Sequence, residues 1–129
     1  MINIMLVEDS VAVRNRLRQI LADIQRFHIV GEYDTAGAAM AALALEPPDV
    51  LLLDIKLRVG NGIEVMRYAH NHAPCAKVIV FSQHDDAGYR EQFEQAGAQF
   101  FFNKTHETGK LIAALSELAS APITGYKAA

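Results

Sequence analysis

Five polar side chains follow short apolar runs of the sequence, at positions where they could act together. Glu8 and Asp9 come directly after the first apolar run, and Asp54 ends the most apolar run of the chain. Ser82 follows the fourth run, and Lys104 comes shortly after the fifth. Three carboxylates within several ångströms of one another cannot all stay ionised without a counter-charge, so either a pKa rises or a cation binds. These residues therefore predict an acidic site with one hydroxyl and one ammonium group.

The ligand types in this cluster favour a hard divalent cation. Carboxylates offer only oxygen, and neither cysteine nor histidine is expected among them, which argues against zinc. A shallow carboxylate site that keeps several waters suits Mg²⁺ or Mn²⁺. An alternative for Asp9 alone is that its charge only complements the N-terminal dipole of the following helix. That alternative does not explain why Asp54 ends the most apolar strand or why Lys104 follows the residues QFFFN.

The elements that must position these residues are five strand–helix units. Runs rich in Val, Ile, Leu and Phe predict strands, and apolar residues at three- and four-residue spacing after each run predict amphipathic helices. Alternating strands and helices predict an α/β fold with a doubly wound, five-stranded parallel sheet of order 2-1-3-4-5. Ligands of such sheets bind beyond the carboxyl ends of the strands. The predicted strands are Ile2–Val7, His28–Tyr33, Val50–Asp54, Lys77–Phe81 and Gln99–Phe102.

Composition excludes several classes of protein. The 129 residues suit one domain, and a net charge of −3 gives no electrostatic reason to bind nucleic acid or an anionic membrane. Cys75 is the only cysteine, so no intramolecular disulfide can form, and a cytoplasmic location is expected. The N-terminus lacks a basic region, and no apolar stretch reaches the length of a membrane span. We expect one domain over residues 1–119 and a frayed C-terminal tail over residues 120–129.

Five motifs, in this order, resemble the receiver domain of two-component response regulators, a family with a flavodoxin-like (βα)5 fold. The resemblance covers roughly residues 1–119; four of the motifs lie at the first, third, fourth and fifth strands, and NG lies in the loop after the third strand. Each motif alone is common, whereas the ordered set is specific. The motifs are LVEDS with Glu8 and Asp9, VLLLDIKL with Asp54, NG with Gly62, VIVFS with Ser82, and GAQFFFNK with Phe101 and Lys104.

The resemblance implies a phosphoacceptor site. Asp54 would take a phosphoryl group from a phosphohistidine on a sensor histidine kinase or a phosphotransfer protein. Mg²⁺, for which Mn²⁺ can substitute, would be held by Asp9, Asp54 and the main-chain carbonyl of Lys56, with Glu8 acting through water. Lys104 would neutralise the other side of the phosphoryl group. The chain would carry out only its own phosphotransfer and slow self-dephosphorylation, and would not be an enzyme with turnover.

The resemblance also implies a conformational switch with a protein partner. Ser82 would donate a hydrogen bond to the phosphoryl group and draw its loop toward the site, leaving space into which Phe101 turns. The output would be a binding surface on the fourth helix, fifth strand and fifth helix, used by a downstream protein, a fused output domain or a second copy in a homodimer.

Several residues depart from the family's pattern. Phe101 has no hydroxyl, so its readout should be steric, and Thr105 follows the lysine where a proline is usual. Arg58 stands in place of a common proline in the loop after the phosphoacceptor. Lys56 and His84 border the path that attacking water takes in the family, which predicts an altered lifetime of the acyl phosphate.

Other functions are left open by the sequence. A pseudo-receiver that binds partners without phosphorylation would be expected to lack Asp9, Asp54 or Lys104, and all of them are present. A metal-dependent phosphohydrolase would want a second acid two residues after the nucleophile, where Lys56 stands. No DNA-binding segment is expected after the receiver motifs. The chain is therefore expected to be a stand-alone receiver, a phosphorelay shuttle or a receiver cut from a longer regulator.

Overall fold

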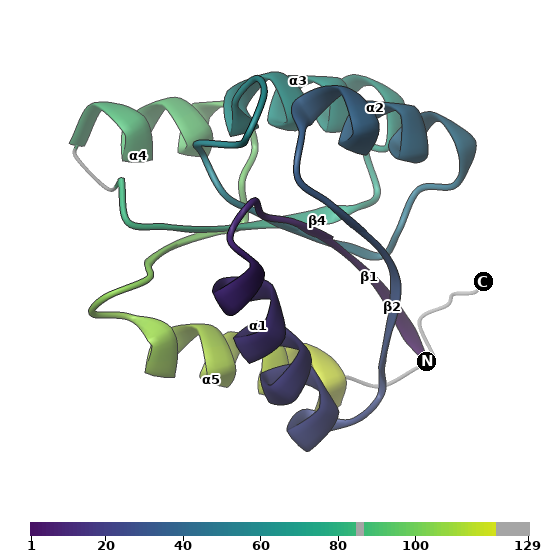
Figure 1. Ribbon diagram of the computed structural model, residues 1–129, viewed down its shortest axis with the longest axis vertical. Coiled ribbons are helices and arrows are strands. Elements are labelled where there is room, and N and C mark those ends of the chain that lie inside the picture. Colours follow the sequence, from purple (N-terminus) through teal and green to yellow (C-terminus); the bar gives the residue numbers. More distant parts are fainter. Residues whose placement is uncertain (85–86, 121–129) are drawn as a thin grey trace.

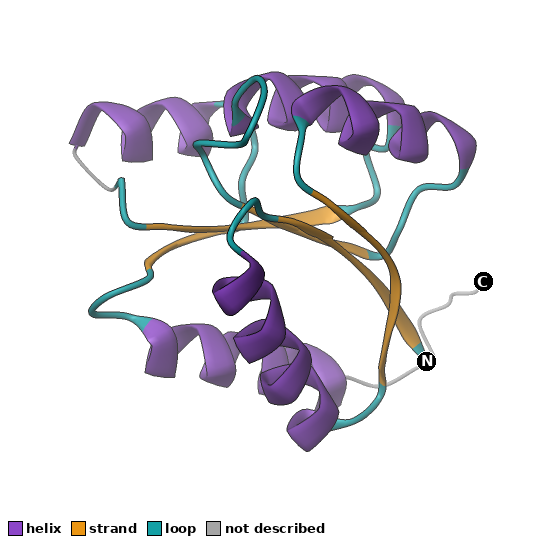
Figure 2. Ribbon diagram, in the orientation of Figure 1, coloured by secondary structure: helices purple, strands orange, loops and turns teal. Residues whose placement is uncertain are grey.

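The computed structural model describes residues 1–84 and 87–120, and its centre is a five-stranded sheet between two layers of helices (Figures 1 and 2). Strands and helices alternate along the chain, as the sequence predicts. The strands are β1 Ile2–Val7, β2 Phe27–Tyr33, β3 Val50–Leu53, β4 Lys77–Ser82 and β5 Phe100–Asn103. The helices are α1 Val11–Ile24, α2 Ala36–Leu45, α3 Gly62–His72, α4 Ala87–Gln95 and α5 Thr108–Ser120.

The sheet has the order β2-β1-β3-β4-β5, and all four strand pairs are parallel, which confirms the predicted topology. Val7 of β1 pairs with Leu53 of β3, and Leu53 pairs with Val80 of β4. The carboxyl ends of the two central strands are therefore level. The residues that follow β1 and β3 must leave the sheet side by side.

Alternate strand residues face the two helical layers. Helices α2, α3 and α4 cover one face of the sheet, and α1 and α5 cover the other (Figure 1). Met5 and Val7 belong to the core cluster on the first face, and Ile4 and Leu6 belong to the cluster on the second. All four residues of β3 are buried, because helices cover both of its faces. This burial explains why β3 is apolar throughout.

Polar side chains cap the N-termini of three helices. Ser10 and Thr35 accept hydrogen bonds from backbone N–H groups of the first turns of α1 and α2. Asn61 forms a capping box with Glu64 at the start of α3. At the end of α4, Gly97 has a φ of 104°, a conformation that favours glycine. The three N-terminal caps satisfy N–H groups that have no partner within the helix.

The boundaries differ from the predictions by a residue or two. Asp54 lies just beyond β3, because its side chain accepts a hydrogen bond from the next backbone N–H and turns the chain out of the strand. Ser82 is the last residue of β4, whereas the prediction ends that strand one residue earlier. Ser120, assigned above to the tail, is the last residue of α5, and residues 121–129 lie outside the described residues. Within residues 1–84 and 87–120, no helix has the length and apolar character needed to cross a membrane.

Candidate functional site

The three predicted acids meet at the carboxyl edge of the sheet. One carboxylate oxygen from each of Glu8, Asp9 and Asp54 lies within 4.8 Å of the others. Glu8 and Asp54 are buried, and Asp9 is exposed. The site therefore has a buried acidic floor and one solvent-facing acid, and its donor set consists of oxygen atoms alone.

Backbone hydrogen bonds beyond the strand ends hold the acids in place. The Glu8 N–H donates to the carbonyl of Tyr33 at 2.9 Å, and the Asp54 N–H donates to the carbonyl of Val7 at 2.9 Å. These bonds continue the pairing of β1 with β2 and β3 by one residue. A side-chain oxygen of Glu8 also accepts from the Ser10 N–H at 3.0 Å. Both buried carboxylates are thus anchored through main chain and side chain.

Lys104 supplies the counter-charge directly. Its Nζ lies 2.7 Å from Glu8 Oε1 and 2.8 Å from Asp54 Oδ2. The Lys104 N–H donates to the carbonyl of Ser82 at 3.1 Å, and the Lys104 carbonyl accepts from the Thr108 hydroxyl at 3.0 Å. The loop after β5 therefore aims this ammonium group at the two buried acids. The sequence predicted the convergence, but not that one lysine would bridge both carboxylates.

Burial and crowding change the acid–base chemistry of the site. Burial, followed by repulsion from Asp54, raises the pKa of Glu8 from its ordinary value of 4.5 to about 7, although Lys104 and the Ser10 N–H oppose the rise. Burial alone would lower the pKa of Lys104, but its hydrogen bonds to Asp54 and Glu8 outweigh this effect and raise it. Lys104 therefore stays protonated near neutral pH, while Glu8 exchanges a proton there.

The loop between β3 and α3 is folded tightly against the site. The Gly62 N–H donates to the carbonyl of Ile55, and a Cβ atom at Gly62 would lie 2.2 Å from the carbonyl oxygen of Asp54. Only glycine fits this close approach. Lys56 lies on the same loop and forms an isolated bridge with Asn61, and its side chain is exposed. The role of its carbonyl as a metal ligand stays a prediction.

Arg58 ties that loop to the loop after β2. Its backbone N–H donates to the carbonyl of Asp34 at 3.0 Å, and its Nε donates to an Asp34 carboxylate oxygen at 2.9 Å. This ion pair lowers the pKa of Asp34. A proline at position 58 could not donate the first bond. Arg58, which stands where the family commonly has proline, therefore links the two loops in a way that proline could not.

Ser82 lies at the end of β4 and is fully buried. Its Oγ accepts a hydrogen bond from the His84 N–H at 3.1 Å, so the hydroxyl proton is not used in that bond. Ser82 pairs with Asn103 of β5, next to Lys104. The serine and the lysine are thus on neighbouring strand ends, as predicted. Among the described peptide bonds none is cis, and this includes the bond before Thr105.

Phe101 lies on the face of β5 that packs against α4, and it is buried, with 5% of its surface exposed. Its ring meets Phe93 of α4 edge-on, at a centroid distance of 5.9 Å. The guanidinium carbon of Arg90 lies 4.7 Å from the centroid of the Phe101 ring. Phe101 therefore lies in a buried, inward position in this structure, and its movement on phosphorylation stays a prediction. Sequence reasoning missed Arg90, because nothing in the spacing of α4 marks it.

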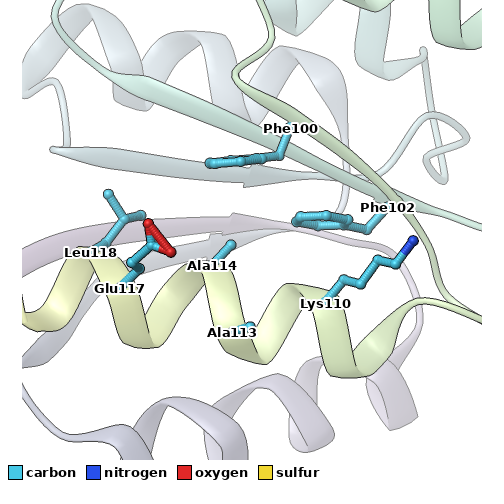
Figure 3. A pocket seen from close by; sticks show the side chains of 7 residues that line it. All are labelled: Phe100, Phe102, Lys110, Ala113, Ala114, Glu117 and Leu118. Atoms are coloured by element: carbon cyan, nitrogen blue, oxygen red, sulfur yellow. The ribbon is translucent and has the colours of Figure 1, made fainter.

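An apolar groove runs between β5 and α5 (Figure 3). Phe100 and Phe102 stack with a centroid distance of 5.5 Å and form one wall, and Phe100 is 42% exposed. Lys110 and Glu117 of α5 stand along the other wall in the figure. The groove has a volume of about 510 Å³ and is lined also by Ala113, Ala114 and Leu118.

The sequence matches a known family over most of its length. A family model described as the response regulator receiver domain matches residues 4–116. The transcriptional regulatory protein DegU of Brevibacillus brevis is 30% identical over 118 residues, which are 92% of this chain and 50% of that protein. The response regulator GacA of Pseudomonas aeruginosa is 30% identical over 119 residues, 92% of this chain and 55% of that protein. The chain therefore spans about half the length of these curated relatives.

Solved structures agree with the sequence matches. The response regulator domain of Thermotoga maritima CheB is similar with a TM-score of 0.80 at 25% identity, covering 92% of this chain and 93% of that one. A chain of the CheX-CheY-BeF3-Mg+2 complex from Borrelia burgdorferi has a TM-score of 0.81 at 21% identity, over 93% of this chain and 90% of that one. The second likeness supports the fold alone. Fold, motif order and family match together show that this chain belongs to the receiver domain family of response regulators.

Proposed function

We propose that this chain accepts a phosphoryl group on Asp54 from a sensor histidine kinase or a phosphotransfer protein, in the cytoplasm. The observation that carries the proposal is the cluster of three acids with Lys104 bridging two of them. Such a cluster combines a carboxylate nucleophile with an ammonium group that can neutralise a phosphoryl oxygen. It is open to solvent at Asp9, where a donor can approach.

The donor set fits Mg²⁺, with Mn²⁺ as a substitute. Its oxygen atoms suit a hard cation, and three acids opposite one ammonium group leave negative charge to be balanced. Asp9, Asp54 and the Lys56 carbonyl would hold the ion, with Glu8 contributing through water. The exposure of Asp9 and the engagement of Glu8 with Lys104 support this division of roles. The ion would supply positive charge to the phosphoryl oxygens.

The residues of the chain then perform the transfer. A carboxylate oxygen of Asp54 forms a new bond to phosphorus as the bond from phosphorus to the donor imidazole nitrogen breaks, and that nitrogen keeps the electron pair. Asp54 Oδ1 is fixed by the Ile55 N–H at 2.7 Å, which orients the carboxylate. Lys104, now 2.8 Å from Asp54 Oδ2, would turn to a phosphoryl oxygen. The hydroxyl of Ser82 would donate to another and draw its loop inward.

The output is proposed to be a protein-binding surface on α4, β5 and α5. The groove beside Phe100 and Phe102 supports this, because an exposed aromatic side chain such as Phe100, with charged residues at the margin, is typical of contact sites. The occupant is proposed to be a downstream protein, a fused output domain or a second copy in a homodimer. A fused domain agrees with the relatives, which are about twice as long as this chain. The chain itself would carry out no catalytic turnover.

Two other functions are weaker candidates. A phosphorelay shuttle would use the same site and pass the phosphoryl group on to a histidine. A phosphorylation-independent interaction module is disfavoured, because Asp9, Asp54 and Lys104 are all present and assembled. Acid residues two positions after the nucleophile would favour a phosphohydrolase, but Lys56 stands there and is exposed.

Labelling by a small phosphodonor such as acetyl phosphate tests the proposal. Intact mass should increase by one phosphoryl group in the wild type only when Mg²⁺ is present. Asp54→Asn should abolish this increase, whereas Asp23→Asn, a change of an exposed aspartate on α1, should leave it unchanged. If Asp54→Asn is labelled to the wild-type level, Asp54 is not the nucleophile.

A further inference from the structure

Arg90 of α4 contacts the proposed switch residue in two ways. Its guanidinium carbon lies 4.7 Å from the centre of the Phe101 ring, which is a cation–π contact. Its Nη1 also donates to the carbonyl oxygen of Phe101 at 2.9 Å. One side chain therefore contacts both the ring and the backbone of the same residue. No feature of the family resemblance assigns a role to this arginine.

Glu107 orients the guanidinium from the other side. Its Oε1 lies 3.3 Å from Arg90 Nη2 and also accepts from the Asn103 N–H at 2.9 Å. The bond from Asn103, followed by Lys110 and Arg90, lowers the pKa of Glu107, so this carboxylate is ionised at neutral pH. Glu107 follows Lys104 by three residues. The arginine is thus linked to the loop that carries the lysine of the site.

Phe101 is enclosed on two sides in this arrangement. Phe93 packs edge-on against its ring, and Phe93 is itself fully buried. An outward turn of Phe101 would expose an aromatic ring to water and break the cation–π contact. Both changes cost free energy, so both disfavour the outward position. Neither cost depends on a phosphoryl group.

We propose that Arg90 is a positioning residue that holds Phe101 inward before phosphorylation, so that the aromatic switch of this receiver is preset. The proposal deepens the proposed function, because it states what phosphorylation would still change. Movement would be confined to Ser82 and the start of α4, while the ring stays in place. A partner that requires an inward Phe101 would then find it in nearly all unphosphorylated molecules.

Fluorine NMR can follow the ring directly. The six phenylalanines are replaced by 4-fluorophenylalanine, and the Phe101 signal is identified by its loss in Phe101→Leu. A soluble gadolinium chelate broadens signals of exposed rings, with Phe100 as the exposed reference. In the phosphate-free wild type without Mg²⁺, the Phe101 signal should be protected. In Arg90→Gln the exposed population should grow roughly tenfold.

Two further variants make the result specific. Arg90→Lys keeps a cation near the ring but not the paired geometry, and should rescue part of the protection. Arg67→Gln, a change of an exposed arginine on α3, should behave as the wild type. If Arg90→Gln does not fold, as judged by circular dichroism, Glu107→Gln weakens the same contact and should give a smaller rise in exposure.

A second measurement adds beryllofluoride with Mg²⁺. The Phe101 signal of the wild type should stay protected, whereas that of Arg90→Gln should return toward the protected state. The proposal is overturned if wild-type Phe101 is exposed until beryllofluoride is added, or if Arg90→Gln and the wild type are equally protected without it. If beryllofluoride does not bind at all, the proposed phosphoacceptor function is in question, and the comparison without Mg²⁺ still decides the role of Arg90.

Discussion

Replacing Glu8 by glutamine should change stability in a direction that depends on pH. The variant should be no more stable than the wild type at pH 5 but more stable at pH 8. The side chain is 2% exposed and lies beside Asp54, which is why its pKa is about 7 in the folded chain. Its ordinary value is 4.5. Between these two pH values the folded chain carries a proton that the unfolded chain has lost. The contribution of Glu8 to the free energy of unfolding therefore falls as pH rises from 4.5 to about 7, and it is constant above that pH.

The magnitude follows from the pKa. At about 1.4 kcal/mol per pKa unit, a rise from 4.5 to about 7 means that ionisation of Glu8 destabilises the folded chain by at most about 3.5 kcal/mol. Glutamine does not ionise, but its NH2 group replaces one of the two carboxylate oxygens, Oε1 facing Lys104 or Oε2 facing the Ser10 N–H, so one acceptor is lost at a cost of about 1 kcal/mol. We therefore expect Glu8→Gln to exceed the wild type in stability by about 1 to 2 kcal/mol at pH 8. At pH 5 we expect it to be equal or slightly less stable.

Urea unfolding followed by circular dichroism measures this difference. Curves are recorded at pH 5, 6, 7 and 8 with a chelator, so that no divalent ion occupies the acids. Groups that titrate equally in both proteins cancel in the difference. Glu91→Gln, a change of an exposed glutamate on α4, is the control and should show no such trend. The reasoning is refuted if Glu8→Gln and the wild type have the same pH dependence, or if the variant is less stable at pH 8.

Three other substitutions test the site and its support. Gly62→Ala places a Cβ 2.2 Å from the Asp54 carbonyl oxygen, so urea unfolding should show a loss of about 2 kcal/mol or more, and labelling by acetyl phosphate should slow; unchanged stability would contradict the close approach. Lys104→Met removes the ammonium between two buried acids, so calorimetry should detect Mg²⁺ binding at least as tight as in the wild type while labelling falls. Weaker Mg²⁺ binding would show that the lysine does not compete with the ion. Phe93→Ala removes a fully buried ring and should cost about 3 to 5 kcal/mol in chemical denaturation; a cost below 1 kcal/mol would mean that the cavity closes.

Much of the fold could be predicted from local pattern. The apolar run of β3 and the alternation of strands with amphipathic segments gave the five parallel strands and their order, because buried parallel strands need helices on both faces. Ser10, Thr35 and Asn61 marked helix starts, because their side chains satisfy free N–H groups. Strand and helix ends were less certain, since they depend on single hydrogen bonds such as the one that Asp54 accepts.

The convergence of Glu8, Asp9, Asp54 and Lys104 was also determined by the sequence. Parallel strands bring their carboxyl ends to one edge, so residues that follow neighbouring strands must meet. The order of the motifs was enough to identify the family, which the match over residues 4–116 confirms.

Only the tertiary structure decided how charges and rings are paired. The sequence left open whether a pKa rises or a counter-charge is supplied, because the outcome depends on distances of about 3 Å between residues some 50 to 96 positions apart. In the structure both occur: Lys104 bridges Glu8 and Asp54, and the pKa of Glu8 still rises. The inward position of Phe101 depends in the same way on Arg90, which lies on another element. Periodicity places a residue on a face of an element, but side-chain packing between elements selects its partner.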